Sequence, residues 1–115
     1  MTAVHRKLDN LVAILDYNGL QIDGSIEEVK SLTGIPGRFR AFGWHVIEIN
    51  GHDPDAIAAA FDEARTIKGR PCMVIAKTIK GKGVSFMEGE AGWHGKAPKP
   101  EQLEQALKEL DGGEA

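Results

Sequence analysis

Three short runs of apolar residues divide the chain, and polar segments that contain glycine separate them. The runs cover residues 8–15, 44–49 and 71–77; the first is apolar on both faces from Leu11 onward, and the third is unbroken. Unbroken apolar runs of this length are typical of parallel strands whose two faces are both buried. The middle run alternates loosely and is rich in residues that favour strands. We therefore predict a β-strand in each run.

The most distinct helix signal lies between the second and third runs. Asp53 is placed to cap a helix, Pro54 takes its first position, and Gly69 is placed to stop it. A second amphipathic helix is predicted near the C-terminus. The apolar positions at helical spacing are Ile57, Ala60, Phe61, Ala64 and Ile67 in the first helix, and Leu103, Ala106, Leu107 and Leu110 in the second.

Shorter elements fill the remaining segments. Residues 1–7 read as the tail of a helix, and Ser25 with Glu28 forms a capping-box pattern that predicts a helix over residues 26–32. Breaks at residues 34–37 precede a helical piece over 38–42. A hairpin around residues 18–19 is an alternative, weakened because residues 20–23 are short and polar. A glycine-rich and lysine-rich loop is expected from residue 79 to about residue 99, and a polar Gly-Gly tail follows the last helix.

The alternation of strands and helices predicts an α/β fold, a partial doubly wound parallel sheet of about three strands with flanking helices. Sheets average about five or six strands, and buried parallel strands need cover on both faces. We therefore expect residues 1–110 to form the second half of a doubly wound domain that needs a companion, with 111–115 as a polar tail.

Composition narrows the functional classes. The chain has 115 residues, enough for one domain at most, and its formal net charge of -3 gives no reason to expect nucleic acid as a partner. The single cysteine, Cys72, allows no internal disulfide and lies in an apolar run, so it is predicted to be a small buried hydrophobic residue in a reducing compartment. No apolar stretch reaches the roughly 20 residues that span a membrane. Charged residues interrupt the N-terminus where a signal peptide would lie, so a cytoplasmic location is expected.

The end of the first strand is the candidate functional site. Oxygen-bearing side chains, Asp16 and Asn18, follow the apolar run and precede a glycine turn. Ligands of open α/β sheets bind beyond the carboxyl ends of the strands. Carboxylate, amide and carbonyl oxygens are ligands for magnesium, which completes its shell with water and phosphate oxygens. The alternative is an ordinary turn in which both side chains bond their own backbone.

Several segments, in the same order, resemble the transketolase family. They are KLDNL (7–11) with DYNGLQIDG (16–24), FRAFGW (39–44), NGHD (50–53), and KTIKGKG (77–83) leading to WHGKAP (93–98). The resemblance runs from residue 7 to about residue 110. It is to the back half of the thiamine-diphosphate-binding domain, in the style of split bacterial or archaeal transketolases.

The resemblance implies a cofactor, thiamine diphosphate, held through Mg²⁺ or another divalent cation such as Ca²⁺ or Mn²⁺. Asn18 matches the asparagine whose side-chain oxygen binds the metal, and Leu20 matches a residue whose backbone carbonyl does so. Ile22 matches a position beside the thiazolium and diphosphate, and Ile79 matches an apolar wall. His94 matches a histidine that contacts the diphosphate and the substrate side of the pocket, which makes it the catalytic candidate.

Other residues keep two interpretations. Ile22 is either a cofactor contact or plain core, and His52 reads as structural because it precedes a helix cap. Lys77, Lys80 and Lys82 either steer anionic sugar phosphates or form a solvated loop. His94 is weighed in the same way against an exposed loop histidine.

The family's Gly-Asp-Gly motif, whose aspartate is a metal ligand, falls before Met1 when counted back from Asn18. The glutamate that activates the cofactor belongs to a separate pyrimidine-binding domain. We therefore expect the chain to supply half of a cofactor site, to bind cofactor weakly or not at all by itself, and to be inactive alone. Companion polypeptides carrying both missing parts, an oligomeric assembly, and sugar phosphate substrates follow from the resemblance.

The implied reaction is transfer of a two-carbon ketol unit between sugar phosphates in the pentose phosphate pathway. Two alternatives remain at this point. One is another thiamine-diphosphate enzyme, of the deoxyxylulose-phosphate synthase or dehydrogenase E1 type, although the Trp93–His94–Gly95 segment favours transketolase. The other is a non-catalytic scaffold or interaction fragment that keeps the fold.

Overall fold

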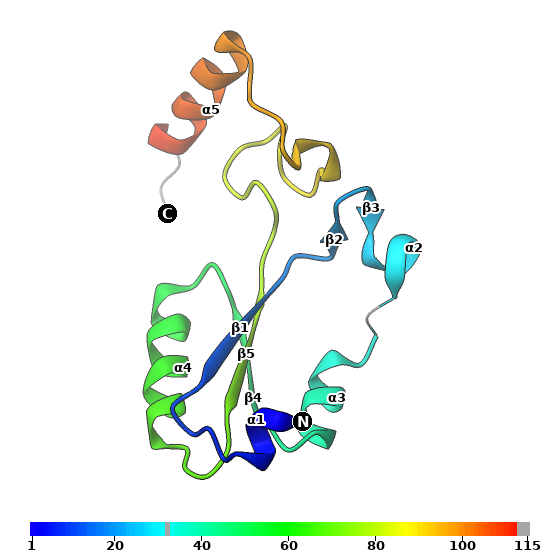
Figure 1. Ribbon diagram of the computed structural model, residues 1–115. Coiled ribbons are helices and arrows are strands. Elements are labelled where there is room, and N and C mark those ends of the chain that lie inside the picture. The colour runs from blue at the N-terminus through cyan, green and yellow to red at the C-terminus, as the bar shows by residue number, and fades with distance from the viewer. Residues whose placement is uncertain (32, 113–115) are drawn as a thin grey trace. The chain divides into compact units, whose positions relative to one another are not determined.

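The computed structural model describes residues 1–31 and 33–112, which divide into two compact units (Figure 1). The sheet unit contains residues 1–17 and 33–78. The loop unit contains residues 18–31 and 79–112.

A parallel sheet forms the centre of the sheet unit. Its strands are β1 (Val12–Tyr17), β4 (His45–Asn50) and β5 (Cys72–Lys77), in the spatial order β1-β5-β4. Ile14 lies opposite Val74, and Val74 lies opposite Ile47. The predicted parallel α/β sheet is therefore confirmed, with the last strand of the sequence in the middle and buried along nearly its whole length.

The first strand begins later than predicted. The N-terminal helix α1 (Thr2–His5) is a single turn, and the backbone N–H of Leu11 donates to the carbonyl of Leu8 at 3.2 Å. The Asp9 carboxylate accepts the Gly69 N–H at 3.0 Å. Residues 9–10 therefore form a turn, and the bonds of this strand to β5 begin at the Leu11 carbonyl, which accepts the Cys72 N–H at 3.0 Å.

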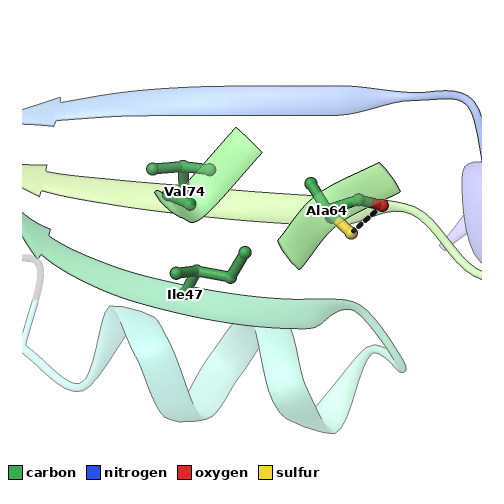
Figure 2. Close-up of a cluster of buried hydrophobic side chains, with 5 residues drawn as sticks. Ile47, Ala64 and Val74 are labelled. Carbon is green, nitrogen blue, oxygen red and sulfur yellow. Dashed lines mark hydrogen bonds between the residues drawn. The ribbon is translucent and has the colours of Figure 1, made fainter. Parts of the chain in front are cut away.

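Helix α4 (Pro54–Thr66) covers one face of the sheet. The Asp53 side chain accepts the N–H groups of Asp55 and Ala56 at 2.9 and 3.2 Å, so the predicted cap is confirmed. The core beneath this helix is shown in Figure 2 and consists of Ile47, Ala60, Ala64, Cys72 and Val74. The helix ends at Thr66, before Gly69, because Ile67 already has an extended backbone.

Helix α3 (Ile35–Ala41) covers the opposite face, as Figure 1 shows. Ile35, Met73 and Ile75 are buried there, and the rings of Phe39 and Trp44 meet edge-to-face at 5.6 Å. The prediction that this helix begins at residue 38 is wrong. Gly34, with a φ of 71°, precedes the helix. Pro36 fits the first turn, because backbone N–H groups there have no partner within the helix and proline's missing N–H costs no hydrogen bond.

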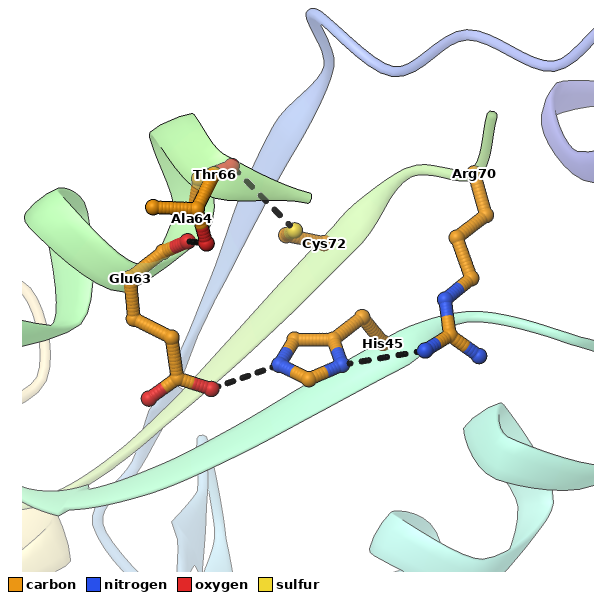
Figure 3. A network of polar contacts seen from close by, with 6 residues as sticks. All are labelled: His45, Glu63, Ala64, Thr66, Arg70 and Cys72. Carbon is orange, nitrogen blue, oxygen red and sulfur yellow. Dashed lines mark hydrogen bonds and ion pairs between the residues drawn. The ribbon is translucent and has the colours of Figure 1, made fainter. Parts of the chain in front are cut away.

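A polar network joins the start of β4 to α4 (Figure 3). The ring atom Nε2 of His45 lies 2.6 Å from Glu63 Oε1, and Nδ1 lies 3.5 Å from the Arg70 guanidinium. Arginine only donates, so Nδ1 accepts and Nε2 carries the proton shared with Glu63. Cys72 is buried beside this network, and burial raises the pKa of its thiol. The prediction of a small buried cysteine is confirmed.

The loop unit begins with a small antiparallel hairpin. Strands β2 (Leu20–Gln21) and β3 (Gly24–Ser25) pair across a turn at residues 22–23. The hairpin therefore differs from the alternative considered around residues 18–19, and residues 20–21 pair although they were expected to pair poorly. Ile22 takes a φ of 38° and supplies the left-handed residue that such turns need. The hairpin leads into α2 (Ile26–Lys30), whose predicted capping box between Ser25 and Glu28 is confirmed. This helix ends at Lys30, short of the prediction, and residue 32 lies outside the described residues.

The rest of the loop unit is the predicted long loop and the C-terminal helix. The loop contains one short helical turn, η1 (Ala91–Trp93), and leads into α5 (Pro100–Gly112). Helix α5 continues through Asp111 and Gly112, beyond the predicted end at residue 110, and residues 113–115 lie outside the described part. Within residues 1–31 and 33–112, no helix has the length and apolar character to cross a membrane.

Candidate cofactor-binding site

A small pocket in the loop unit brings most of the predicted site residues together. Its volume is about 40 Å³. Its lining residues are Asn18, Leu20, Ile22, Lys80, Ala91 and His94. Four of the five residues predicted from the sequence are among them. Two segments separated by more than fifty positions in the sequence thus meet at one place.

The Asn18 side chain belongs to a tight turn. Its Oδ1 accepts the backbone N–H of Leu20 at 2.9 Å, and the Gly19 carbonyl accepts the N–H of Ile26 at 3.0 Å. The turn alternative considered for this asparagine is therefore correct as local geometry. An amide oxygen has two lone pairs, so one remains for a ligand. The turn and the metal site are compatible.

Ile22 is an exposed side chain on a strained backbone. It is 61% exposed, so the interpretation as plain core is wrong. A positive φ at a β-branched residue is a rare conformation that costs free energy. Strain of this kind persists where surrounding structure holds it, and it concentrates at functional sites. Here the hairpin and the capping box hold an apolar side chain at the pocket.

His94 follows a well-anchored tryptophan. The Trp93 indole Nε1–H donates to the Phe86 carbonyl at 2.9 Å, and the two rings lie 5.4 Å apart. The Lys96 ammonium sits 4.7 Å from the centre of the Trp93 ring. The His94 N–H donates to the Ala91 carbonyl at 2.9 Å. These contacts fix the backbone that presents the imidazole at the pocket.

Lys80 is the pocket residue that the sequence left undecided. The neighbouring lysines are paired, Lys77 with Glu48 at 3.9 Å and Lys82 with Glu88 at 3.5 Å. Across residues 1–31 and 33–112, Lys80 makes no ion pair, and it is half-buried. Ile79, the predicted apolar wall, is 43% exposed and does not line the pocket.

The donor set fits one end of the implied cofactor. The amide oxygen of Asn18 and the carbonyl of Leu20 are ligands that magnesium accepts, and Lys80 and His94 can donate to phosphate oxygens. A water needs about 10–15 Å³ of such space, so 40 Å³ suits an ion and part of its shell, not a whole cofactor. The residues present therefore fit a metal and phosphate anchor.

Among the described residues that line this pocket, none is acidic. Asp16 belongs to the sheet unit, where its carboxylate accepts the Thr78 hydroxyl. In the described part of the chain, no group of three or more His, Cys, Asp or Glu side chains could hold a metal ion. The pocket thus offers neutral oxygen ligands and cationic or neutral donors.

Known proteins place these observations in a family. The family model for the transketolase thiamine diphosphate binding domain matches residues 1–113. The chain is 43% identical over 111 residues to 6-deoxy-6-sulfo-D-fructose transketolase subunit SqwG of Clostridium sp. strain MSTE9, covering 96% of this chain and 40% of that protein. It is 49% identical over 104 residues to an apulose-4-phosphate transketolase subunit from Phocaeicola vulgatus, covering 90% of this chain and 37% of that protein.

A solved structure is similar as well. The chain superposes on transketolase from Campylobacter jejuni with a TM-score of 0.86 and 34% identity, covering 96% of this chain and 17% of that one. The chain spans about two fifths of the length of the two subunit relatives. With the family model matching nearly every residue, the chain belongs to the transketolase family and forms part of a thiamine diphosphate binding domain.

Proposed function

We propose that this chain supplies the metal and diphosphate anchor of a split transketolase. The observation that carries the proposal is the convergence of Asn18, Leu20, Lys80 and His94 on one pocket. Two relatives are named as transketolase subunits, which supports an assembly of several polypeptides. When bound, thiamine diphosphate supplies the carbanion chemistry of ketol transfer, and the protein supplies binding, orientation and electrostatics.

Each pocket residue has a distinct role in this proposal. Asn18 Oδ1 and the Leu20 carbonyl are ligands of a divalent cation, Mg²⁺ or alternatively Ca²⁺ or Mn²⁺. Lys80 and His94 donate to the diphosphate oxygens, with His94 also facing the substrate. Ile22 provides an apolar wall beside the ring system. Ile79, which was expected as an apolar wall, does not line the pocket, whereas its neighbour Lys80 does.

Charge balance gives a reason for a companion. Neutral ligands alone hold a divalent cation weakly, because magnesium sites in proteins use one or two carboxylates. The described lining of the pocket contains no carboxylate, and Lys80 adds a positive charge beside the cation. We infer that the carboxylate comes from a companion segment carrying the Gly-Asp-Gly motif, and the activating glutamate from a pyrimidine-binding domain. Residues 1–110 are this chain's share of the cofactor domain.

The open edge of β1 supports a companion of this kind. Ile14 is 60% exposed in the middle of that strand, although it points to the same face as the core residues Val74 and Ile47. Beside the same strand lies a groove of about 340 Å³, lined by the apolar residues Val12, Phe61 and Ala64 and by four polar or charged side chains. An uncovered apolar edge strand is a template for another strand.

The other edge of the sheet is protected. Strand β4 carries Glu48, which pairs with Arg40 at 2.9 Å and with Lys77 at 3.9 Å. Charged side chains on an edge strand disfavour pairing with another chain. A companion strand is thus expected at β1, extending the parallel sheet. The assembly would be an oligomer of this chain with its companion.

The substrates are proposed at the level of chemical class. The two subunit relatives are named for 6-deoxy-6-sulfo-D-fructose and apulose 4-phosphate, both anionic sugars. We propose ketol transfer between anionic sugars, sugar phosphates in the first instance. A non-catalytic scaffold is the competing function, and cofactor binding separates the two.

The proposal is tested by calorimetric titration of thiamine diphosphate with Mg²⁺. The titration is made into the chain alone and into the chain mixed with the part of the Phocaeicola vulgatus relative that this chain does not match. Binding that appears only in the mixture supports the anchor, with Ile14→Glu abolishing it through loss of assembly. If the mixture assembles, as sedimentation shows, and yet binds no cofactor, the scaffold function stands instead.

A further inference from the structure

Helix α5 is tied to the long loop by one carboxylate. Glu109 accepts the backbone N–H of Ser85 at 2.6 Å and the Ser85 hydroxyl at 2.8 Å. It also accepts the Gln105 side-chain amide at 2.8 Å. Both donors of Ser85 are used by the two oxygens of one side chain. A charged acceptor makes shorter and stronger hydrogen bonds than a neutral one.

The loop held by Glu109 is closed on itself. The Gly89 N–H donates to the Lys80 carbonyl at 2.9 Å, which joins the two ends of the segment. Gly81 has a φ of 71°, and a Cβ there would lie 2.6 Å from the Met87 carbonyl oxygen. Val84 is buried inside the loop. These contacts close residues 80–89 into one compact loop.

Both ends of the 80–89 loop connect to the cofactor pocket. Its first residue, Lys80, lines the pocket directly. Further along, the Phe86 carbonyl holds the Trp93 indole at 2.9 Å, and His94 is the next residue in the chain. A displacement at Ser85 is therefore passed to both donors proposed for the diphosphate.

We propose that Glu109 is a positioning residue for the cofactor pocket, acting through Ser85 to fix the separation of Lys80 and His94. The inference rests on the proposed function and deepens it. It assigns a role to the C-terminal helix, which none of the pocket residues belongs to. Glu109 itself touches neither cofactor nor metal.

The surroundings of Glu109 favour its ionised carboxylate, which is the form that accepts both Ser85 hydrogen bonds. The Ser85 backbone N–H is the main cause that lowers the pKa of Glu109, followed by the Gln105 and Ser85 side chains. The charged groups that face it are Lys108 on its own helix and Glu88 on the loop. The pKa of Glu109 is lower in the folded chain than in the unfolded chain. The bonds to Ser85 are therefore complete when the pH is above the pKa of the unfolded chain, and they are lost as the pH falls through the pKa of the folded chain.

The test uses Glu109→Gln, with Glu104→Gln as the matched control. Glu104 lies on the same helix and pairs only with Lys108 within the described residues, at 2.7 Å. Glutamine keeps the size but offers one acceptor where Ser85 needs two. Two readouts are used, the affinity of the assembled complex for thiamine diphosphate, and Trp93 emission in a Trp44→Phe background, which leaves one tryptophan.

We expect Glu109→Gln to weaken the affinity about tenfold, the scale of one lost charge-assisted hydrogen bond, while Glu104→Gln leaves it unchanged. Trp93 emission should be constant above the ordinary pKa of a glutamate and should change as the pH falls below it in the parent chain, but not in Glu109→Gln. Equal affinity and equal pH profiles in Glu109→Gln and its parent would overturn the proposal. If the parent assembly binds no cofactor, the proposed function fails, and the Trp93 emission profile still decides whether Glu109 positions the loop.

Discussion

The Oδ1 atom of Asn18 accepts the backbone N–H of Leu20 at 2.9 Å, so the two proposed metal ligands are parts of a single closed turn. The bond fixes the side-chain orientation of Asn18 before any ligand arrives. A preorganised ligand loses less conformational entropy on binding. The same bond is also what an ordinary turn would make, and only metal-linked binding separates the two roles.

The strained backbone at Ile22 leads to a first prediction. Its φ of 38° is a conformation in which glycine is favoured over β-branched residues. Both glycine variants should lower the free energy of unfolding, but the loss should be about 1 kcal/mol smaller for Ile22→Gly than for Gln21→Gly. The reason is that relief of backbone strain at Ile22 offsets the flexibility of glycine. Thermal and urea unfolding of the chain measure this difference.

Gln21 is the matched control because it lies in β2, next to Ile22, with an ordinary φ. Ile22→Gly should also weaken cofactor binding in the assembly, since it removes an apolar side chain from the pocket. Equal destabilisation by the two glycine variants would show that the backbone at Ile22 stores no strain.

A second prediction separates two neighbouring lysines. Lys80 lines the pocket, whereas Lys82 pairs with Glu88 at 3.5 Å. We expect Lys80→Met to weaken the affinity of the assembly for thiamine diphosphate about tenfold, because a direct charge-assisted contact with phosphate is lost. Lys82→Met should change it less than about twofold, the scale of a screened surface charge.

The affinities are measured by titration at low and at high salt. The difference between the two variants should persist at high salt, because a direct contact is screened less than a distant charge. Equal losses in both variants would instead assign the lysines to general attraction of anions, with no specific contact.

Burial of Cys72 gives a third prediction. Its pKa is raised chiefly by burial, which the nearby Arg70 only partly offsets. The thiolate is the form that reacts with alkylating reagents. Near neutral pH the folded chain should therefore react with iodoacetamide far more slowly than the chain in denaturant, with mass spectrometry following the modification. Fast modification of the folded chain would mean that the α4 side of the sheet opens readily.

The sheet could be predicted from the sequence because its signals are local. The unbroken run of residues 71–77 identifies β5, a parallel strand buried on both faces, and Asp53 with Pro54 identifies the start of α4. The capping box of α2 was predictable for the same reason. Turn and cap residues act on their immediate neighbours, so their effect can be read without tertiary structure.

Other features depend on contacts that the sequence does not display. The β2–β3 hairpin places a positive φ on Ile22, where glycine is expected, so the sequence did not indicate the left-handed residue of this turn. Strand β5 ends at Lys77, and beyond it the alternation of a strand no longer predicts which side chains point the same way. The sequence therefore did not show that Lys80, and not Ile79, lines the pocket. The role of Glu109 depends on a contact across 24 positions, with no motif to indicate it.

Asn18 is proposed to couple thiamine diphosphate to a divalent cation, and this coupling can be measured directly. The measurement is the affinity of the assembled complex for thiamine diphosphate as a function of Mg²⁺ concentration, for the parent chain, Asn18→Ala and Asn18→Asp. We predict a strong Mg²⁺ dependence in the parent and in Asn18→Asp, and its loss in Asn18→Ala. Losing one hydrogen bond to Leu20 should lower the free energy of unfolding of Asn18→Ala by only about 1 kcal/mol. An unchanged Mg²⁺ dependence in a folded Asn18→Ala complex would contradict the role proposed for this residue.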